Sequence, residues 1–219
     1  MSGLLEVLTE HLDEFGGGLW VTVRLVGASF AIALVVGTLV AALRIAPSVW
    51  LRRLGGIYVE TFRNIPLLVL LTLSYAGLRR AGLPIGTWTA GVASLGLYTA
   101  AYVAEVLRSG VFAVSKGQIE ASLSLGFSYG ETLRRIVLPQ AFRTVIPPLA
   151  SITIAMIKNS AIVGASIIAL SDLLKNARIV QAQTFQEEAF IWAAVGYLLL
   201  TVAATIAIRR LELRYAIRR

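Results

Sequence analysis

Residues 18–46 read GLWVTVRLVGASFAIALVVGTLVAALRIA, and this run decides the fold. Between Gly18 and Ala46 the only charged side chains are those of Arg24 and Arg44. An α-helix needs about 20 predominantly apolar residues to cross the hydrocarbon core of a bilayer. The run is long enough and apolar enough to do so, and it predicts a transmembrane helix.

Four further apolar runs follow, at residues 57–78, 86–107, 146–170 and 189–208. The composition agrees, because 57% of the 219 residues are hydrophobic, only 15% are charged and the mean hydropathy is +0.78. A water-soluble domain carries about 25% charged residues. The sequence therefore predicts an all-α membrane protein with five transmembrane helices. The absence of cysteine and the single histidine, His11, exclude a disulfide scaffold and a multi-histidine metal site.

The formal net charge of +8 suggests either a nucleic-acid partner or a membrane orientation. Lysine and arginine concentrate in the cytoplasmic loops of membrane proteins. If the C-terminus is cytoplasmic, 13 of the 20 basic residues lie inside: Arg44, Arg52, Arg53, Arg108, Lys116, Arg134, Arg135, Arg143, Arg209, Arg210, Arg214, Arg218 and Arg219. The outer side receives only Arg79, Arg80, Lys175 and Arg178. The charge thus indicates orientation, with the N-terminus outside, and no nucleic-acid partner is expected.

Three parts are expected along the chain. Residues 1–17 carry acids at positions 6, 10, 13 and 14 between leucines at helical spacing, which is typical of an amphipathic helix on the outer membrane surface. A frayed polar terminus remains an equal alternative. Residues 18–208 form the five-helix membrane domain, and residues 209–219 form a cytoplasmic basic tail.

The long polar stretch between the third and fourth spans is the most informative one, with its key part at residues 115–141. Ser115 can cap a short helix that runs through Leu125, and Gly126 can end it in the left-handed conformation. Pro139 is expected to break the following segment, and residues 147 and 148, both proline, to begin the fourth span. Small side chains on the short helix would let it seat in a groove of a partner protein.

This stretch resembles the EAA signature of the permease subunits of ATP-binding-cassette importers. The matching residues are Glu120-Ala121, then Leu125-Gly126, then, after nine residues, Ile136-x-Leu138-Pro139. Ser122 departs from the signature, which most often has a second alanine there. Residues 63–68, 100–111 and 158–160 look like three blocks of the polar amino acid branch, most similar to its glutamate and glutamine members. Members for arginine, lysine and histidine share these blocks.

The resemblance implies an importer of two permease subunits, identical or related, two nucleotide-binding ATPase subunits and an extracytoplasmic solute-binding protein, in the bacterial cytoplasmic membrane. It assigns ATPase coupling to the helix between the third and fourth spans, through Glu120, Ala121, Ser122, Leu125 and Gly126. The chain has no G-x-x-x-x-G-K-[ST] loop, so ATP and magnesium are expected on the ATPase subunits. No cofactor, metal or catalytic residue is expected in this chain itself.

The substrate path should contain the ionisable side chains within the spans, because such groups are costly when they face lipid. The candidates are Arg63, Asn64, Tyr102, Glu105, Lys158, Asn159 and Ser160. Glu60 with Arg63, and Glu105 with Arg108, are three residues apart and could instead neutralise each other. Lys158 has no acid within helical reach; it could bind a substrate carboxylate or pair with Glu105 of the neighbouring span.

The sequence thus favours import of glutamate or glutamine by alternating access, with Arg63 and Lys158 facing the substrate carboxylates. A pocket that uses Glu60 and Glu105 would instead suit basic amino acids. A secondary carrier or channel would explain charges within the membrane without an ATPase, but it would not explain the helix with the EAA spacing.

Overall fold

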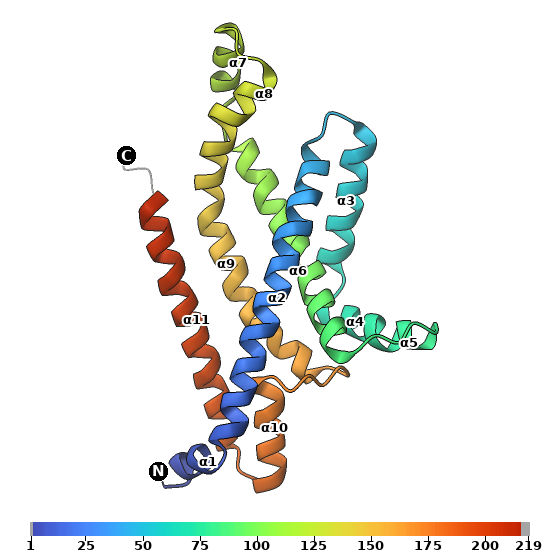
Figure 1. The fold of residues 1–219 in the computed structure, drawn as a ribbon, viewed down its shortest axis with the longest axis vertical. Coiled ribbons are helices and arrows are strands. Elements are labelled where there is room, and N and C mark those ends of the chain that lie inside the picture. Colours follow the sequence, from blue (N-terminus) through green and yellow to red (C-terminus); the bar gives the residue numbers. More distant parts are fainter. Residues whose placement is uncertain (1, 216–219) are drawn as a thin grey trace.

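The computed structural model describes residues 2–215, and within that range the chain is helical without any strand (Figure 1). The elements are α1 (Ser2–Glu10), α2 (Leu12–Ile45), α3 (Val49–Asn64), α4 (Leu67–Thr72), the π-helix η1 (Leu73–Gly77), α5 (Leu78–Arg80), α6 (Thr87–Phe112), α7 (Lys116–Ser124), α8 (Tyr129–Thr132), the π-helix η2 (Leu133–Val137), α9 (Leu138–Ala165), α10 (Leu173–Thr184) and α11 (Glu188–Tyr215).

Four helical stretches of the described chain are long and apolar enough to cross a membrane: α2, α6, the run from α8 through α9, and α11. The helix pair Val49–Asn64 and Leu67–Arg80 makes a fifth span if its two bent halves are counted as one. The prediction of an all-α membrane protein is therefore confirmed, with four or five spans according to how the bent pair is counted. Figure 1 shows α7 and α8 at one end of the molecule and α1 and α10 at the other, which we call the α7 end and the α10 end.

The second span differs most from the sequence prediction. A continuous helix over residues 57–78 was expected, but α3 begins at Val49 and ends at Asn64, and α4 leaves it at an angle of 100°. Pro66 explains the break, because proline cannot donate the helical hydrogen bond and disfavours helical backbone at the residue before it, Ile65. The segment from α4 to α5 then projects sideways from the bundle (Figure 1).

The helices also differ from the predicted segment bounds at three other places. The fourth span was expected to begin near residues 147 and 148, but α9 begins at Leu138 and contains both prolines in its interior. The N-terminal segment was expected to extend to residue 17, but α2 already begins at Leu12. At the other end, α11 extends the last span to Tyr215, into the predicted tail, whose final residues 216–219 lie outside the described range.

The central helix of the bundle is α6, which packs against α2, α3 and α9. Glycine lets these helices approach closely: a Cβ at Gly96 would lie 2.9 Å from the Ile32 side chain, and one at Gly110 would lie 2.2 Å from that of Val145. Small residues at contacts between spans are the usual basis of packing in membranes, where helices gain little from the hydrophobic effect. Gly91 on the same helix is equally close to α9, since a Cβ there would lie 2.9 Å from the Val163 side chain.

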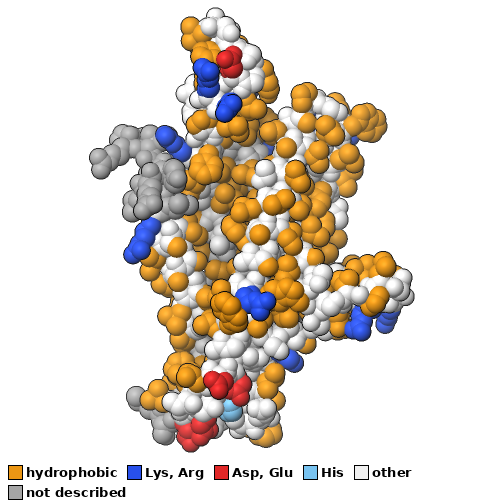
Figure 2. All heavy atoms as spheres, viewed as in Figure 1, with side chains coloured by type: hydrophobic (Ala, Val, Ile, Leu, Met, Phe, Trp, Pro, Cys, Tyr) orange, Lys and Arg blue, Asp and Glu red, His pale blue; other side chains and the backbone are white. Residues whose placement is uncertain are grey.

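Charge is distributed unevenly on the face shown in Figure 2. Most acidic side chains gather at the α10 end, basic side chains lie around α7 and α8 and also at the projecting α5 segment, and hydrophobic side chains cover most of the middle. The described exposed large hydrophobics include Leu39, Leu199 and Val202 on α2 and α11. An apolar belt between polar ends is the surface that a bilayer requires.

Candidate functional site

A charged cavity of about 360 Å³ lies among α2, α3 and α6. Its size falls within the range of about 300–1,000 Å³ that is usual for small-molecule sites. It is lined by Arg44, Val59, Glu60, Arg63, Asn64, Tyr102 and Glu105. Four of the predicted path residues, Arg63, Asn64, Tyr102 and Glu105, are thus brought together from two spans.

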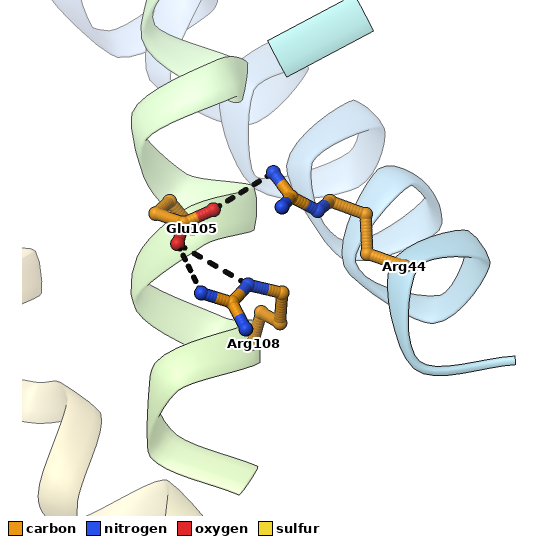
Figure 3. Close-up of polar contacts among 3 residues, drawn as sticks. All are labelled: Arg44, Glu105 and Arg108. Atoms are coloured by element: carbon orange, nitrogen blue, oxygen red, sulfur yellow. Dashed lines mark hydrogen bonds and ion pairs between the residues drawn. The ribbon is translucent and has the colours of Figure 1, made fainter. Parts of the chain in front are cut away.

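Glu105 is held between two guanidinium groups (Figure 3). Its Oε2 accepts a hydrogen bond from Arg44 Nη1 at 2.9 Å, and its Oε1 accepts from Arg108 Nε at 3.2 Å and from Arg108 Nη2. The pairing with Arg108 was one of the alternatives predicted from the i,i+3 spacing and is confirmed. Because one carboxylate serves two cations, this group of three carries a net positive charge.

Arg63 lies on the same cavity without a carboxylate partner. Its guanidinium carbon is 5.4 Å from the centre of the Tyr102 ring, a cation–π arrangement. Among the described residues no acidic oxygen comes within 4.0 Å of it, so the predicted local pair with Glu60 does not form. An unpaired cation in a membrane-spanning region is costly, which makes Arg63 the group in the cavity most ready to accept an anion.

Hydrogen bonds fix the remaining walls of the cavity. The Asn64 amide donates to the carbonyl of Glu60 at 2.7 Å, and the hydroxyls of Tyr98 and Tyr102 are 3.0 Å apart. The Tyr58 hydroxyl donates to the carbonyl of Leu97 at 2.8 Å, which ties α3 to α6. The α3 and α6 sides of the cavity are therefore held at a defined separation.

The block at 158–160 lies elsewhere, on α9. Lys158 is exposed and Asn159 is half-buried, and neither lines the cavity. The alternative pairing of Lys158 with Glu105 does not form, since the two arginines occupy that carboxylate. Ser160 is fully buried and donates to the carbonyl of Ile157 at 2.7 Å. Ser160 therefore packs inside the bundle in this arrangement, and its role on the substrate path stays a prediction.

The short helix α7 forms where the sequence predicted it. The Ser115 side chain accepts a hydrogen bond from the amide of Gln118, and Gly126 has a φ of +86°, the left-handed conformation that glycine adopts without strain. Glu120, Ala121 and Gly126 are exposed, and Leu125 is 79% exposed. An unpartnered leucine at the tip of the molecule is consistent with a docking surface.

Ser122 points inward, away from that surface. It is 2% exposed, and its hydroxyl lies 2.8 Å from that of Thr132 on α8. Among the predicted coupling residues it is the one whose side chain is buried within this chain. The hydroxyl, which an alanine would lack, instead joins α7 to α8, and α8 is itself stabilised by a capping box between Ser128 and Glu131.

The segments described above lie within a region that this chain shares with known proteins. Residues 33–217 match the family described as binding-protein-dependent transport system inner membrane component. The chain belongs to this family. It is therefore an ABC-importer permease, as the resemblance in the stretch from Glu120 to Pro139 implied. The matched region contains the charged cavity, α7 and every span after the first part of α2.

Individual relatives of this permease cover nearly the whole chain. It is 39% identical over 215 residues to a probable glutamine ABC transporter permease protein of Bacillus subtilis. The alignment covers 98% of this chain and 97% of the relative. It is 37% identical over 212 residues to a glutamate transport system permease protein of Corynebacterium glutamicum, covering 91% and 93%. A crystal structure of an amino acid ABC transporter with histidines matches with a TM-score of 0.89 and 34% identity, covering 94% of this chain and 96% of that one.

Three residues that line the cavity were not among the predicted site residues: Arg44, Val59 and Glu60. Arg44 counted only as a cytoplasmic-side charge, because it lies at the end of the first span and its partner is 61 positions away. Glu60 was considered as a local partner of Arg63 and, for a basic substrate, as a pocket residue together with Glu105, but it was not among the favoured path residues. The sole sequence signal for either was an ionisable group near a span end, and that signal does not identify a partner on another helix.

Proposed function

We propose that this permease imports a polar amino acid, with glutamate or glutamine favoured, and that the cavity among α2, α3 and α6 binds it on the way. The unpaired Arg63 is the observation that carries this proposal. With Arg44 and Arg63 positive, the cavity suits a carboxylate, while the exposed Glu60 is available for the α-amino group. Every amino acid carries both groups, and a side-chain carboxylate or amide adds a further acceptor for Arg63.

Import of a basic amino acid is the second candidate. Glu60 forms no ion pair among the described residues, so it is available to a cationic side chain. The matching crystal structure of an amino acid transporter with histidines supports keeping this alternative. In that case Arg63 would still hold the α-carboxylate, and Glu60 would contact the side chain.

The test is ATP-dependent uptake of labelled amino acids by the complete transporter in proteoliposomes. We expect glutamate or glutamine to be preferred over arginine, lysine and histidine. Arg63→Gln should raise the substrate KM by at least about tenfold, because a charge-assisted hydrogen bond contributes about 1.5–3 kcal/mol. Arg79→Gln is the matched control, since Arg79 is exposed and far along the chain in α5, and its KM should not change. Equal KM values for the Arg63 and Arg79 variants would contradict the role of the cavity.

Lys158 and Asn159 enter this proposal as residues facing the second permease subunit. Lys158 is exposed and Asn159 half-buried on α9, so neither side chain is fully covered within one chain. A path between two permeases would be lined by such residues from both copies. Lys158→Gln should then lower the maximal uptake rate while leaving insertion in the membrane intact, which comparison of protein levels in membranes would check.

We propose that α7 couples the permease to an ATPase subunit through Glu120, Ala121, Leu125 and Gly126. Gly126→Asp should leave the protein in the membrane yet abolish transport and weaken ATPase binding, because aspartate tolerates a φ of +86° poorly and adds a charge to the docking surface. Gly117→Ala is the control, since a Cβ there would contact nothing within 4 Å. Normal uptake by Gly126→Asp would overturn the docking assignment.

The remaining partners follow from the family. We infer two ATPase subunits that hydrolyse ATP with magnesium, a second permease subunit and an extracytoplasmic solute-binding protein, while this chain performs no chemistry itself. We also infer that the α7 end is cytoplasmic. The chain lacks cysteine, so single substitutions can report its orientation. A membrane-impermeant maleimide added to intact cells should label Phe185→Cys at the α10 end and not Leu125→Cys at the α7 end.

A further inference from the structure

A buried carboxyl cluster at the α10 end joins four helices and has no part in the cavity described above. Asp172 is 0% exposed, although it lies in the link between α9 and α10. Its Oδ1 accepts from the amide of Lys175 at 2.9 Å, and its Oδ2 accepts from the Tyr197 hydroxyl on α11 at 3.1 Å. The carboxylate therefore caps α10 and binds α11 at once.

The Tyr197 hydroxyl extends this cluster to α2 and α9. It also interacts with the hydroxyls of Thr22 and Ser160. Thr22 in turn accepts from the amide of Leu173 at 3.1 Å and donates to the carbonyl of Gly18 at 2.9 Å. The burial of Ser160, unexplained by the substrate path, is thus accounted for by this cluster.

Three glycines leave the space that the Asp172–Leu173 turn occupies. A Cβ at Gly164 on α9 would lie 1.8 Å from Asp172 Oδ1. Cβ atoms at Gly18 on α2 and Gly196 on α11 would lie 2.9 Å and 2.5 Å from atoms of Leu173. The turn fills the space among α2, α9 and α11. It can leave this space only if the helices separate or the segment between α9 and α10 moves with it.

The link itself, residues 166–172, closes the α10 end of the bundle. Ile168 is 2% exposed and belongs to the same core cluster as Leu71 of α4, Leu25 of α2 and Leu95 of α6. Ala169 has a φ of +50°, which is unfavourable for a residue with a Cβ. The link therefore holds a strained conformation against the apolar core, anchored by Asp172 where α10 begins.

The charged and titratable groups around Asp172 are few. Tyr197 faces it from α11, and Arg178 acts on it from α10, along with the backbone amides of Leu174 and Lys175. From α2 and α9 the groups connected to it are the hydroxyls of Thr22 and Ser160. No basic side chain within the described residues lies within 4.0 Å of its oxygens. Burial therefore outweighs the favourable hydrogen bonds and raises the pKa of Asp172 from 3.8 to about 6.

We propose that Asp172 and its hydroxyl partners form a proton-operated latch, in which a proton bound by Asp172 keeps the 166–172 link closed across the α10 end. A buried carboxyl that binds its proton more tightly than a hydrated one is stabilised in the buried state by protonation. Acidification at the α10 end therefore favours the closed link. Loss of the proton favours the open link, in which water reaches the carboxylate.

The expected size follows from the two titrations. If the open link gives Asp172 an ordinary carboxyl pKa, closure is favoured about fourfold at pH 5.5 and about tenfold at pH 5, relative to pH 7.5. The proposal rests on the proposed import function, and on the α10 end facing outward, only for its transport readout. A labelling readout on the chain itself does not need either.

Labelling of the complete transporter in detergent tests the latch directly. Ile168→Cys, in the otherwise cysteine-free chain, should react with a maleimide only when the link opens. Phe185→Cys, 85% exposed, is the matched control that removes the pH dependence of thiol reactivity. The ratio of the two labelling rates should fall about fourfold from pH 7.5 to pH 5.5. In the Asp172→Asn background the ratio should be low and independent of pH, and a ratio that changes equally in both backgrounds would overturn the proposal.

Uptake by proteoliposomes places the latch in the transport cycle. Lowering only the pH at the α10 side should slow wild-type uptake, and Asp172→Asn should be slow at every pH with the same binding protein present. Glu187→Gln, an exposed acid at the same end, should keep the wild-type response. A response to the pH of the opposite side, or identical profiles for wild type and Asp172→Asn, would contradict the latch. If no amino acid is taken up at any pH, the import proposal fails while the labelling result still decides the latch.

Should Asp172→Asn fail to assemble, Tyr197→Phe is the second variant. It removes the donor to Asp172 Oδ2 and keeps the ring in place. Because the carboxylate loses a hydrogen bond that stabilises its charged form, the midpoint of the labelling response should move to higher pH. An unchanged midpoint would contradict the role of the Tyr197 hydroxyl in the latch.

Discussion

Glu105 and Asp172 are both carboxyl groups held within one bundle, yet their surroundings are opposite. Glu105 lies on α6, is 25% exposed at its side chain, and is paired with Arg44 and Arg108 beside an open cavity. Asp172 is fully buried and is bound by backbone amides and a tyrosine hydroxyl. Fixed cations balance the first charge, whereas neutral dipoles surround the second.

The difference separates two uses of a carboxyl group in a membrane protein. Guanidinium groups keep their charge at any physiological pH, so the cavity at Glu105 keeps a constant electrostatic field that suits a charged solute. Hydroxyls and amides solvate a carboxylate incompletely, so the group at Asp172 can exchange a proton in the physiological range. The four predictions below test this contrast, in order of decreasing effect.

Gly164→Ala should have the largest effect, because the new methyl group would overlap the Asp172 carboxylate. We expect a loss of about 3 kcal/mol or more in the free energy of unfolding, at the upper end of the cost of overpacking. Thermal unfolding in detergent measures it. Gly16→Ala on α2 is the control, since a Cβ there contacts nothing, and it should be neutral or stabilising by up to about 1 kcal/mol. Equal melting temperatures for the two variants would show that Asp172 is not tightly packed.

Asp172→Asn should change the pH dependence of stability. In the wild type the raised pKa means that the folded state binds the proton more tightly, so stability falls as pH rises from about 4 through about 6 and is level above about 7. The full cost of the carboxylate, relative to a neutral group, is about 3 kcal/mol. Melting curves should therefore show Asp172→Asn gaining on the wild type as pH rises through 6. A constant difference from pH 4 to pH 8 would remove the contrast with Glu105.

Glu105→Gln should destabilise by about 2 kcal/mol, because it leaves two arginines without their shared carboxylate in a partly solvated site. The effect should not vary between pH 6 and pH 8, since the arginines stay charged. Adding Arg44→Gln should recover part of the loss, and a double-mutant cycle measures that coupling. If Arg44→Gln recovers nothing, the distance of 2.9 Å between the Arg44 and Glu105 side chains does not reflect a stabilising pair.

Removing single hydroxyls should have the smallest effects and should differ between the two regions. Tyr197→Phe should cost about 1–2 kcal/mol, since it leaves a buried carboxylate oxygen without its donor. Tyr98→Phe removes only a hydroxyl pair at the half-buried cavity wall and should cost about 1 kcal/mol or less. Thermal unfolding of both variants at pH 7.5 provides the comparison, and the reverse order would contradict it.

Features that depend on neighbouring residues in the chain were predictable from the sequence. Apolar runs indicated the spans, Ser115 and Gly126 indicated the ends of α7, and the i,i+3 spacing indicated the pair of Glu105 with Arg108. In each case the interacting groups lie within one helix or one turn. Hydropathy, helix capping and helical spacing therefore suffice to predict these features.

Features that depend on contacts across helices were not predictable. The pairing of Arg44 with Glu105 requires the packing of α2 on α6, and the burial of Ser160 requires Tyr197 from α11. The burial of Asp172 likewise requires Gly164 of α9 and Tyr197 of α11 beside it. Even the break at Pro66 was missed, because the apolar run continues through it and hydropathy does not distinguish a straight span from one bent by 100°.

The prolines inside α9 have a mechanical consequence. Pro147 and Pro148 have no amide hydrogen, so the carbonyls of residues 143 and 144 lack their α-helical donors. Without these two adjacent hydrogen bonds, α9 can bend more easily at Pro147 and Pro148, between α8 at one end and Gly164 near the other. The part of α9 from Pro148 to Ala165 is about 25 Å long, so bending the helix by about 10° at the prolines would displace its far end by about 4 Å. A movement of α7 would then displace the opposite end of the bundle.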